Sequence, residues 1–315
     1  MYRKIMGFLE AWKENEHRKP LILQGARQVG KTYSILEFGR THYENVAYFN
    51  FETNPKLNET FEENISPDYL IPILSHIAGQ TIVKEKTLIV FDEVQLCERA
   101  LTSLKYFCEN APDYHIIVAG SLLGVAVNRA KFSFPVGKVD MKTLYPMDME
   151  EFMLALGEDD LVEQIKKCFQ TDTPLPSALH DAAMQLYRQY LVVGGMPECV
   201  MQFAETKDYI LVRHTQDTIL ASYLNDMSKY NNLNEIKKTR LAYDNITVQL
   251  SKKNTRFQYK LIKKGGRASE FENAIEWLCL SGIVSQVYKV EQIKKPLENY
   301  RDIDAFKIYV SDLGL

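Results

Sequence analysis

One segment of eight residues constrains the fold of this chain more than any other. Residues 25–32 read Gly-Ala-Arg-Gln-Val-Gly-Lys-Thr, which is a complete GxxxxGK(S/T) phosphate loop. An apolar stretch, residues 20–23, comes just before the loop, and a helix-compatible segment, residues 33–40, follows it. A strand, a glycine-rich turn and a helix in this order are what the loop needs to bind phosphate. The pattern therefore predicts an α/β fold built around a nucleotide site.

The positions of the loop have distinct expected roles. The glycines let the backbone turn tightly, so that successive N–H groups face one anion, and the helix that follows adds its positive dipole end. Lys31 is expected to reach the β- and γ-phosphates of ATP, and the Thr32 hydroxyl to hold Mg²⁺. The residues expected to bind the nucleotide are Gly25, Ala26, Arg27, Gln28, Val29, Gly30, Lys31, Thr32 and Tyr33.

Residues 88–93, Leu-Ile-Val-Phe-Asp-Glu, form a second nucleotide signature. Four apolar residues end in two carboxylates, which would therefore emerge at the tip of a buried strand beside the phosphate loop. Asp92 is expected to support Mg²⁺ from the second coordination shell of the metal, and Glu93 to polarise the attacking water as general base. The adjacent acids favour an ATPase over a guanine-nucleotide switch, and no (N/T)KxD guanine-reading motif occurs in the sequence.

A third strand candidate, residues 115–119, is followed by Gly120 and Ser121. A hydroxyl at such a strand tip can lie between the γ-phosphate and the attacking water. Ser121 is therefore a candidate catalytic residue beside Lys31 and Glu93, and an ordinary Gly-Ser turn is the alternative. Four arginines are candidates for an arginine finger, and the sequence favours none of them: Arg129, Arg213, Arg240 and Arg267.

The chain is expected to form three regions. Residues 1–147 alternate short apolar runs with helix-periodic stretches, the pattern of a parallel sheet with crossover helices. Strand signals vanish in residues 148–232, where helical periods dominate. Residues 233–315 show helices followed by two strand candidates, a winged-helix layout that other small α+β units share. We therefore predict a P-loop NTPase sheet with flanking helices, a helical connector and a winged-helix-like domain.

The apolar runs of the first region place its secondary structure. The expected strands are residues 20–23, 46–51, 87–91, 115–119 and 139–144, and the expected helices between them are residues 32–40, 68–78 and 98–109. Two of the strand candidates are nearly all apolar, as expected for strands that are covered on both faces.

Composition and charge narrow the class of protein. The net charge of −3 gives no global attraction to nucleic acid or to an anionic membrane, so such binding must come from a local patch. No uninterrupted apolar run reaches the roughly 18 residues of a membrane span, and residues 1–19 lack the apolar core of a signal peptide. The five cysteines are widely spaced and form no CxxC pair, which predicts reduced thiols and no metal site among them. We therefore expect a cytoplasmic protein with no membrane partner.

One local patch is basic enough to be a candidate nucleic-acid surface. Residues 252–267 contain seven cations and no acid, with Phe257 and Tyr259 interleaved. The cations are Lys252, Lys253, Arg256, Lys260, Lys263, Lys264 and Arg267. The helical segment that follows carries three glutamates within residues 270–276, which would repel phosphates. A solvated face or a protein-docking patch is therefore at least as good an interpretation as DNA binding.

With these motifs in place, the chain resembles a family of prokaryotic AAA-like ATP-binding proteins that have a C-terminal domain of unknown function. The matching landmarks are the phosphate loop with its Ala-Arg-Gln-Val interior, Phe-Asp-Glu-Val-Gln at 91–95, Ala-Gly-Ser at 119–121, Phe-Pro-Val-Gly-Lys at 134–138, Leu-Tyr-Pro-Met at 144–147, Gly-Gly-Met-Pro-Glu at 194–198 and Tyr-Val-Ser-Asp-Leu-Gly-Leu at 309–315. The resemblance implies a P-loop ATPase domain followed by a winged-helix-containing domain. Family members usually continue into a nuclease-like domain, whereas this sequence ends at Leu315, which puts a nuclease function in doubt and leaves truncation and loss of that domain as the two explanations.

The sequence therefore predicts a Mg²⁺-dependent ATPase that couples the state of ATP to the winged-helix-like domain. Hydrolysis is expected to be slow alone, because the transition state needs an arginine from a partner or a second domain, which leaves a homo-oligomer or a protein partner open. One alternative is a nucleotide-gated module that binds DNA or protein, in which hydrolysis is incidental. Another is a small-molecule phosphotransferase, against which the Asp-Glu pair speaks.

Overall fold

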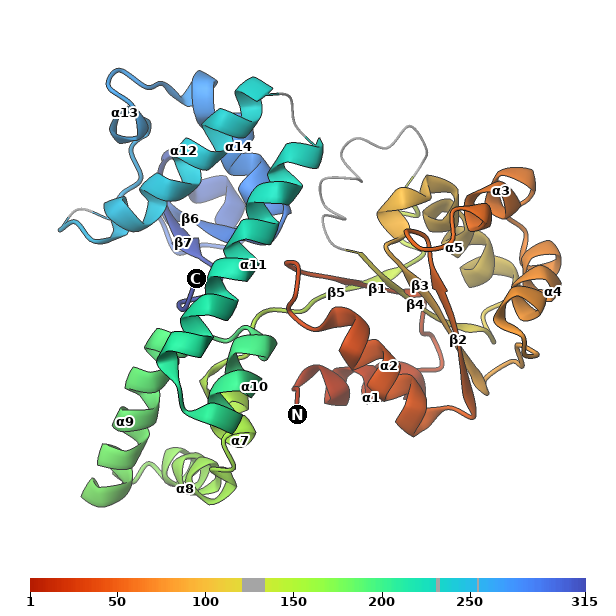
Figure 1. Cartoon of the computed structure of the whole chain (residues 1–315), viewed down its shortest axis with the longest axis horizontal. Helices are drawn as coiled ribbons and strands as arrows, with labels where there is room; N and C mark the ends of the chain where they lie inside the picture. The colour runs from red at the N-terminus through yellow and green to blue at the C-terminus, as the bar shows by residue number, and fades with distance from the viewer. Residues whose placement is uncertain (121–133, 231–232, 254) are drawn as a thin grey trace. The chain divides into compact units, whose positions relative to one another are not determined.

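The computed structural model describes residues 1–120, 134–230, 233–253 and 255–315. They divide into two compact units, Met1–Tyr145 and Pro146–Leu315. Figure 1 draws the first unit in red to yellow and the second in green to blue. The second unit contains both the predicted connector and the region predicted to be winged-helix-like.

The first unit contains a five-stranded sheet and the helices that connect its strands. The strands are β1 (Leu21–Gln24), β2 (Asn45–Asn50), β3 (Thr87–Asp92), β4 (His115–Ala119) and β5 (Asp140–Thr143). The helices are α1 (Ile5–Glu14), α2 (Lys31–His42), α3 (Lys56–Glu63), α4 (Pro67–Ala78) and α5 (Glu98–Asn110), and a short 3-10 helix, η1 (Val94–Leu96), follows β3. Each strand begins and ends within one residue of its predicted range.

The strands form the order β2-β3-β4-β1-β5, and each neighbouring pair is parallel. Leu21 of β1 lies opposite Ile117 of β4 on one side and Asp140 of β5 on the other. Because parallel strands end at the same edge of a sheet, the segments that follow β1 and β3 lie at one edge, with β4 between these two strands. This topology confirms the predicted P-loop NTPase-like sheet with flanking helices.

Both faces of the sheet are covered at its centre, which is why most residues of the central strands are apolar. On one face Phe91 of β3 packs with Phe51 and with Phe61 of α3, the three rings meeting edge to face with centroids 5.5–5.9 Å apart. On the other face the backbone of α2 lies directly on the sheet. A Cβ at Gly39 would stand 2.5 Å from a methyl carbon of Val46, so this close approach requires glycine. Every residue of β3 is buried as a result.

Helix α3 is not among the elements predicted from the sequence. Its eight residues, Lys-Leu-Asn-Glu-Thr-Phe-Glu-Glu, bury only Leu57 and Phe61, which lie four residues apart on one face. Two apolar positions in so short a segment are too few for a helical period to stand out from a charged loop.

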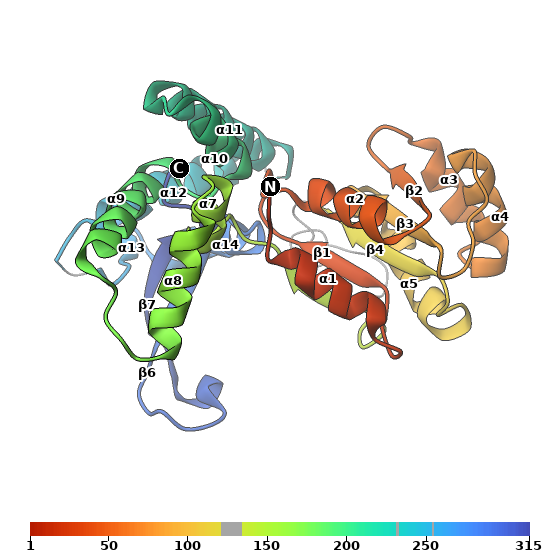
Figure 2. The same ribbon diagram turned by 90° about the horizontal axis from the view of Figure 1, so that it is seen from below.

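The second unit is mostly helical and contains a β-hairpin. Its helices are α7 (Met149–Ala155), α8 (Asp159–Gln170), α9 (Ser177–Val193), α10 (Pro197–Thr206), α11 (Tyr209–Tyr230), α12 (Leu233–Leu250), α13 (Tyr259–Ile262) and α14 (Ala268–Leu280), with the 3-10 helix η2 (Leu297–Tyr300). Strands β6 (Val284–Val290) and β7 (Arg301–Val310) pair antiparallel, and Figure 2 shows the loop that joins them. Within the described ranges, no helix is both long enough and apolar enough to cross a membrane.

A set of hydrogen bonds, which we call the Asp312 clasp, joins three distant segments of the second unit. The Asp312 carboxylate accepts hydrogen bonds from the backbone N–H groups of Gly195, at 2.6 Å, and Gly314, at 2.9 Å. The Gly195 carbonyl accepts one from the backbone N–H of Met147, also at 2.6 Å. A Cβ at position 195 would lie 2.0 Å from the Met147 carbonyl oxygen, so only glycine fits there. The Gly-Gly-Met-Pro and Ser-Asp-Leu-Gly segments therefore meet in space.

Replacing Asp312 with alanine is expected to destabilise the second unit. The change leaves the N–H groups of Gly195 and Gly314 without their acceptor, and a buried donor that loses its partner costs about 1–3 kcal/mol. Urea unfolding followed by circular dichroism should give a lower midpoint for Asp312→Ala than for Glu298→Ala, which removes an exposed acid from the hairpin loop. Equal midpoints for the two variants would contradict a stabilising clasp.

Candidate functional site

The phosphate loop lies between β1 and α2 and turns through three residues with positive φ. These are Gly25 at +149°, Gln28 at +64° and Gly30 at +89°. At Gly25 a Cβ would stand 2.2 Å from the carbonyl oxygen of Leu144, so the loop begins in direct contact with the segment that follows β5. Helix α2 begins at Lys31, and the amides of its first turn have no intrahelical acceptor. The loop therefore has the form of an anion-binding nest.

Lys31 is buried inside this loop. Its side-chain ammonium donates hydrogen bonds to the carbonyl oxygens of Gly25, at 2.9 Å, and Ala26, at 2.7 Å. Burial lowers the pKa of Lys31 to about 8, although the nearby charges of Glu93 and Asp92 act in the opposite direction. The ammonium is thus desolvated and is held by neutral carbonyl groups, which an anionic ligand would replace with stronger partners.

Asp92, at the end of β3, is the centre of a hydrogen-bond network. Its Oδ2 accepts from the hydroxyl of Thr32, at 2.9 Å, and from the hydroxyl of Tyr48, at 2.7 Å. Its Oδ1 accepts from the backbone N–H of Glu93, at 3.0 Å. The structure therefore brings together Thr32 and Asp92, the two residues that the sequence assigns to Mg²⁺.

Glu93 follows Asp92 in a left-handed conformation, with φ at +53°. Its carboxylate accepts a hydrogen bond from the side-chain amide of Gln95 in η1. Burial raises the pKa of the Glu93 carboxyl above its ordinary value. A half-buried carboxylate with a raised pKa beside the phosphate loop has the properties of a general base.

The Thr32 hydroxyl, at the end of the loop, and the Asp92 carboxylate, at the end of β3, fit a Mg²⁺ site. Both are hard oxygen ligands, and Mg²⁺ is usually held by one or two protein oxygens together with substrate phosphates. Thr32 supplies one such oxygen, and the Asp92 carboxylate, which accepts the Thr32 proton at 2.9 Å, would support the metal through this hydroxyl. Among the residues that the structure describes, no cluster of three or more His, Cys, Asp or Glu forms a separate metal cage.

Three residues of this region were not predicted from the sequence. Tyr48 lies on β2, and the phenol contacts Asp92 only because β2 and β3 are neighbours. Gln95 lies in the Phe-Asp-Glu-Val-Gln segment, but no role could be assigned to it without the geometry. Arg3 donates hydrogen bonds to the carbonyl oxygens of Val29, at 2.9 Å, and Tyr145, at 2.7 Å. It therefore links the phosphate loop to the N-terminal segment and to the segment after β5.

The structure says less about the other predicted site residues. Tyr33, in the first turn of α2, is 56% exposed. Ser121 lies outside the described residues, as does the arginine-finger candidate Arg129. Arg213 pairs with Asp217 one helical turn away, at 2.7 Å, on the surface of α11. The two remaining candidates are Arg240, exposed on α12, and Arg267, which precedes α14.

The seven basic residues of the 252–267 patch are all exposed, but their aromatic neighbours are not free. Phe257 is 5% exposed and stacks on Phe306 of β7, with centroids 5.7 Å apart. Tyr259 meets Phe257 edge to face. Both rings therefore pack against Phe306 of β7, and the buried ring of Phe257 is not available to stack on bases. Lys263 forms an ion pair with Glu270, at 2.8 Å, which reduces the local charge further.

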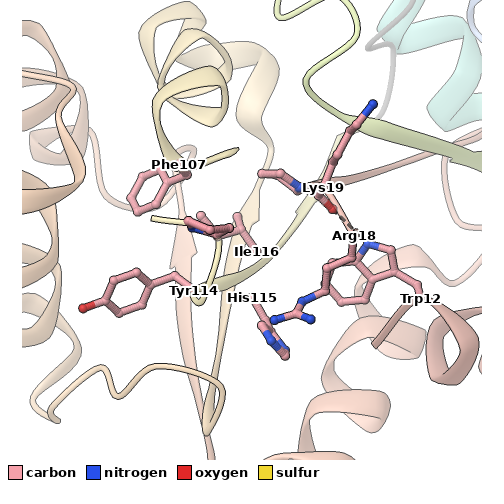
Figure 3. A pocket seen from close by; sticks show the side chains of 9 residues that line it. Trp12, Arg18, Lys19, Phe107, Tyr114, His115 and Ile116 are labelled. Carbon is pink, nitrogen blue, oxygen red and sulfur yellow. Dashed lines mark hydrogen bonds between the residues drawn. The ribbon is translucent and has the colours of Figure 1, made fainter. Parts of the chain in front are cut away.

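A small pocket lies at the other edge of the sheet, where β4 begins (Figure 3). Trp12, Arg18, Tyr114 and His115 are among the residues that line it. Its volume of about 10 Å³ is room for one water molecule and far too little for a nucleotide. His115 is 4% exposed, its Nδ1 lies 2.7 Å from the Tyr43 hydroxyl, and its Nε2 has no hydrogen-bond partner in the described structure.

His115 is expected to make the first unit sensitive to acid. Burial lowers its pKa to about 4 from the ordinary value of 6.5. Between these two values the unfolded chain binds a proton that the folded state does not, so the stability is expected to fall as the pH drops through this window. The urea midpoint at pH 7 minus that at pH 5 should shrink in His115→Leu and stay unchanged in His76→Leu, which alters an exposed histidine of α4. An unchanged difference in His115→Leu would contradict this assignment.

The first unit has the fold of a P-loop NTPase, with a parallel five-stranded sheet and flanking helices. Residues 17–153 match the family model of an AAA domain. Residues 184–315 match a model described only as a domain of unknown function (DUF8612). A comparison with curated protein sequences found no match.

Two solved structures are similar to nearly the whole chain. The Walker-type ATPase PABY2304 of Pyrococcus abyssi has a TM-score of 0.59 at 14% sequence identity, and the match covers 99% of this chain and 94% of that one. The ORC2 protein of Aeropyrum pernix, solved in ADPNP and ADP complexes, has a TM-score of 0.51 at 12% identity, with 98% and 90% of the two chains covered. At these identities the similarity concerns the fold.

Proposed function

We propose that this chain binds ATP with Mg²⁺ and hydrolyses it. The observation that carries the proposal is the contact between Thr32 and Asp92, at 2.9 Å, which joins the end of the phosphate loop to the end of β3. Lys31 precedes Thr32 and Glu93 follows Asp92, and the charges of both carboxylates act on the buried Lys31 ammonium, which supports a single site at this edge of the sheet. The nucleotide complexes of the Aeropyrum structure, a protein of similar fold, support the choice of an adenine nucleotide.

The residues of this chain would divide the work as follows. The loop amides and Lys31 bind the phosphate oxygens, for which the ammonium exchanges the carbonyl groups of Gly25 and Ala26. Thr32 and Asp92 hold the metal, which supplies charge neutralisation at the transferred phosphoryl group. Glu93 accepts the proton of the attacking water, and its raised pKa brings it closer to neutral pH, where a base is most effective.

Hydrolysis is proposed to need a further cation from another copy of this chain or from a partner. In P-loop enzymes an arginine that reaches the transition state contributes about 10³–10⁵-fold in rate. The exposed arginines of the second unit, such as Arg240, are candidates for this role. Phosphate release from ATP should be measured with and without Mg²⁺ over a series of protein concentrations. Specific activity that rises with concentration supports a site completed between subunits, and absent Mg²⁺-dependent release would contradict the proposed ATPase.

The second unit offers a second candidate function, a nucleotide-gated contact with DNA or protein. Helices α12, α13 and α14 followed by the β6–β7 hairpin have the order of a winged helix, and seven exposed cations lie between α12 and α14. The exposed acids of α14, Glu272 and Glu276, oppose its entry into a DNA groove, so the basic patch itself would contact phosphates.

DNA binding measured over a range of salt concentrations, with and without ATP, tests this second candidate. Charge reversal at Lys260, Lys263 and Lys264 should weaken a phosphate contact and reduce its salt dependence. Binding that responds to nucleotide and to these substitutions supports the gated module. Binding that depends neither on nucleotide nor on these substitutions would indicate that the patch is a solvated face. Both candidates are consistent with a protein that acts in the cytoplasm.

A further inference from the structure

The Asp92 carboxylate accepts three hydrogen bonds, one more than Thr32 and the backbone of Glu93 donate. Thr32 follows Lys31 at the end of the phosphate loop, and the backbone N–H of Glu93 belongs to the residue that follows Asp92 in the sequence. The third donor is the hydroxyl of Tyr48, which lies 2.7 Å from Oδ2, the same oxygen that accepts from Thr32. Tyr48 comes from β2, outside both nucleotide motifs.

The strand register explains how Tyr48 reaches this oxygen. Tyr48 lies opposite Val90 in the β2–β3 pairing, and Asp92 lies two residues further along β3. Residues two apart on a strand point to the same face, so the two side chains form a diagonal pair on that face. The Thr32 hydroxyl reaches the same face from the first turn of α2.

The direction of the hydrogen bond follows from Asn50. The Oδ1 of Asn50 accepts from the backbone N–H groups of Glu52, at 2.8 Å, and Thr53, at 3.0 Å, so the amide is fixed with its Nδ2 turned the other way. This Nδ2 donates to the oxygen of Tyr48, at 3.2 Å. The tyrosine oxygen is thus an acceptor for Asn50 and a donor to Asp92, and the chain of donors runs from β2 to β3.

This series of hydrogen bonds matters because the orientation of the Thr32 hydroxyl depends on Asp92. While the Thr32 proton points at Oδ2, its oxygen lone pairs are turned away from the carboxylate and remain available to a cation. Any rotation of the carboxylate would release that proton. Two donors that converge on one oxygen restrict the rotation more than one does.

We propose that Tyr48 is a positioning residue for the Mg²⁺ site, which holds the Asp92 carboxylate so that the Thr32 oxygen faces the metal. This inference rests on the proposed binding of nucleotide and Mg²⁺. A purely structural alternative is that the phenol only pairs β2 with β3. Tyr48 as a residue is 38% exposed, and the two roles predict different results for the loss of its hydroxyl.

Binding of Mn²⁺, used as a probe for Mg²⁺, separates these roles. Free Mn²⁺ is measured by electron paramagnetic resonance during titration of the ADP-bound protein, and ADP affinity is measured separately in EDTA. Tyr48→Phe is expected to weaken Mn²⁺ binding about tenfold, the lower end of the range for residues that orient a metal ligand, and to leave ADP affinity in EDTA unchanged. Tyr43→Phe removes a hydroxyl from the same unit at the other sheet edge, beside His115, and should change neither value.

Mn²⁺ affinity in Tyr48→Phe equal to that of the wild type would overturn the positioning role. A loss of ADP affinity in EDTA equal to the loss of Mn²⁺ affinity would overturn it too, because it would indicate a general disturbance of the loop. If the wild-type ADP complex itself bound no Mn²⁺, the proposed metal site would fail together with this inference. Failure at Tyr48 alone leaves the proposed ATPase intact.

Discussion

Replacing Lys31 with alanine is expected to abolish ATP binding at concentrations where the wild type is saturated. The ammonium lies inside the loop and would make charge-assisted hydrogen bonds to phosphate oxygens, each worth about 1.5–3 kcal/mol. The loss of two such bonds corresponds to a decrease in affinity of at least about 100-fold. Isothermal titration with ATP, or displacement of a fluorescent ATP analogue, measures this directly.

The control for this variant is Lys86→Ala. Lys86 forms a surface ion pair with Glu44, at 2.8 Å, beside the strand starts of β2 and β3 and away from the loop. Its removal should leave ATP affinity at the wild-type value. Misfolding is not expected to explain the loss in Lys31→Ala, because burial of the ammonium already disfavours its charged form. Thermal unfolding checks this, and a folded Lys31→Ala protein with wild-type affinity would refute the phosphate-loop assignment.

Glu93→Gln is expected to keep ATP affinity and lose turnover. The amide has nearly the shape of the carboxylate but cannot accept a proton from water, and general-base catalysis contributes about 10²–10⁴-fold. The phosphate contacts of the loop do not involve this side chain. Single-turnover hydrolysis should therefore slow by at least about 100-fold, while titration with ATP gives the wild-type constant.

Glu44→Gln serves as the matched control, since it makes the same change at the surface pair with Lys86. It should hydrolyse ATP at the wild-type rate. Wild-type turnover in Glu93→Gln would show that another group accepts the proton. A loss of affinity in Glu93→Gln would instead indicate that the carboxylate, with its bond to Gln95, supports the loop.

Strands β3 and β4 could be predicted from the sequence because they are parallel and covered on both faces. Such strands read as uninterrupted apolar runs, and β3 and β4 are buried at every position. Helix α3 could not be predicted, because its short segment buries only Leu57 and Phe61. The order of the strands was also beyond the sequence, since each crossover leaves several arrangements open.

The candidate site divides along the same line. Lys31 and Thr32 lie in one motif and Asp92 in another, and each motif is a continuous stretch of sequence. The chemistry of phosphate and Mg²⁺ binding alone indicates that the two motifs must meet. The contacts of Tyr48 and Arg3 depend on which strand neighbours which and on how the N-terminal segment returns to the loop. No local pattern records such tertiary information.

The basic patch shows the limit of pattern reasoning in the second unit. Aromatic residues among cations are typical of nucleic-acid surfaces, and Phe257 fits that pattern in the sequence. In the structure its ring stacks on that of Phe306 of β7, with the two centroids 5.7 Å apart. Whether an aromatic residue is a surface platform or a core residue depends on a partner far along the chain.

The Asp312 clasp has a consequence for how the protein is made. It joins Met147, where the second unit begins, to Gly195 and to Asp312 and Gly314, which are almost the last residues of that unit. Domains generally fold in the order in which they are synthesised. The sheet needs only the first 145 residues, whereas the clasp cannot close before residue 314 has left the ribosome. In a nascent chain the phosphate loop and β3 would therefore be complete before the residues that close the second unit had been synthesised.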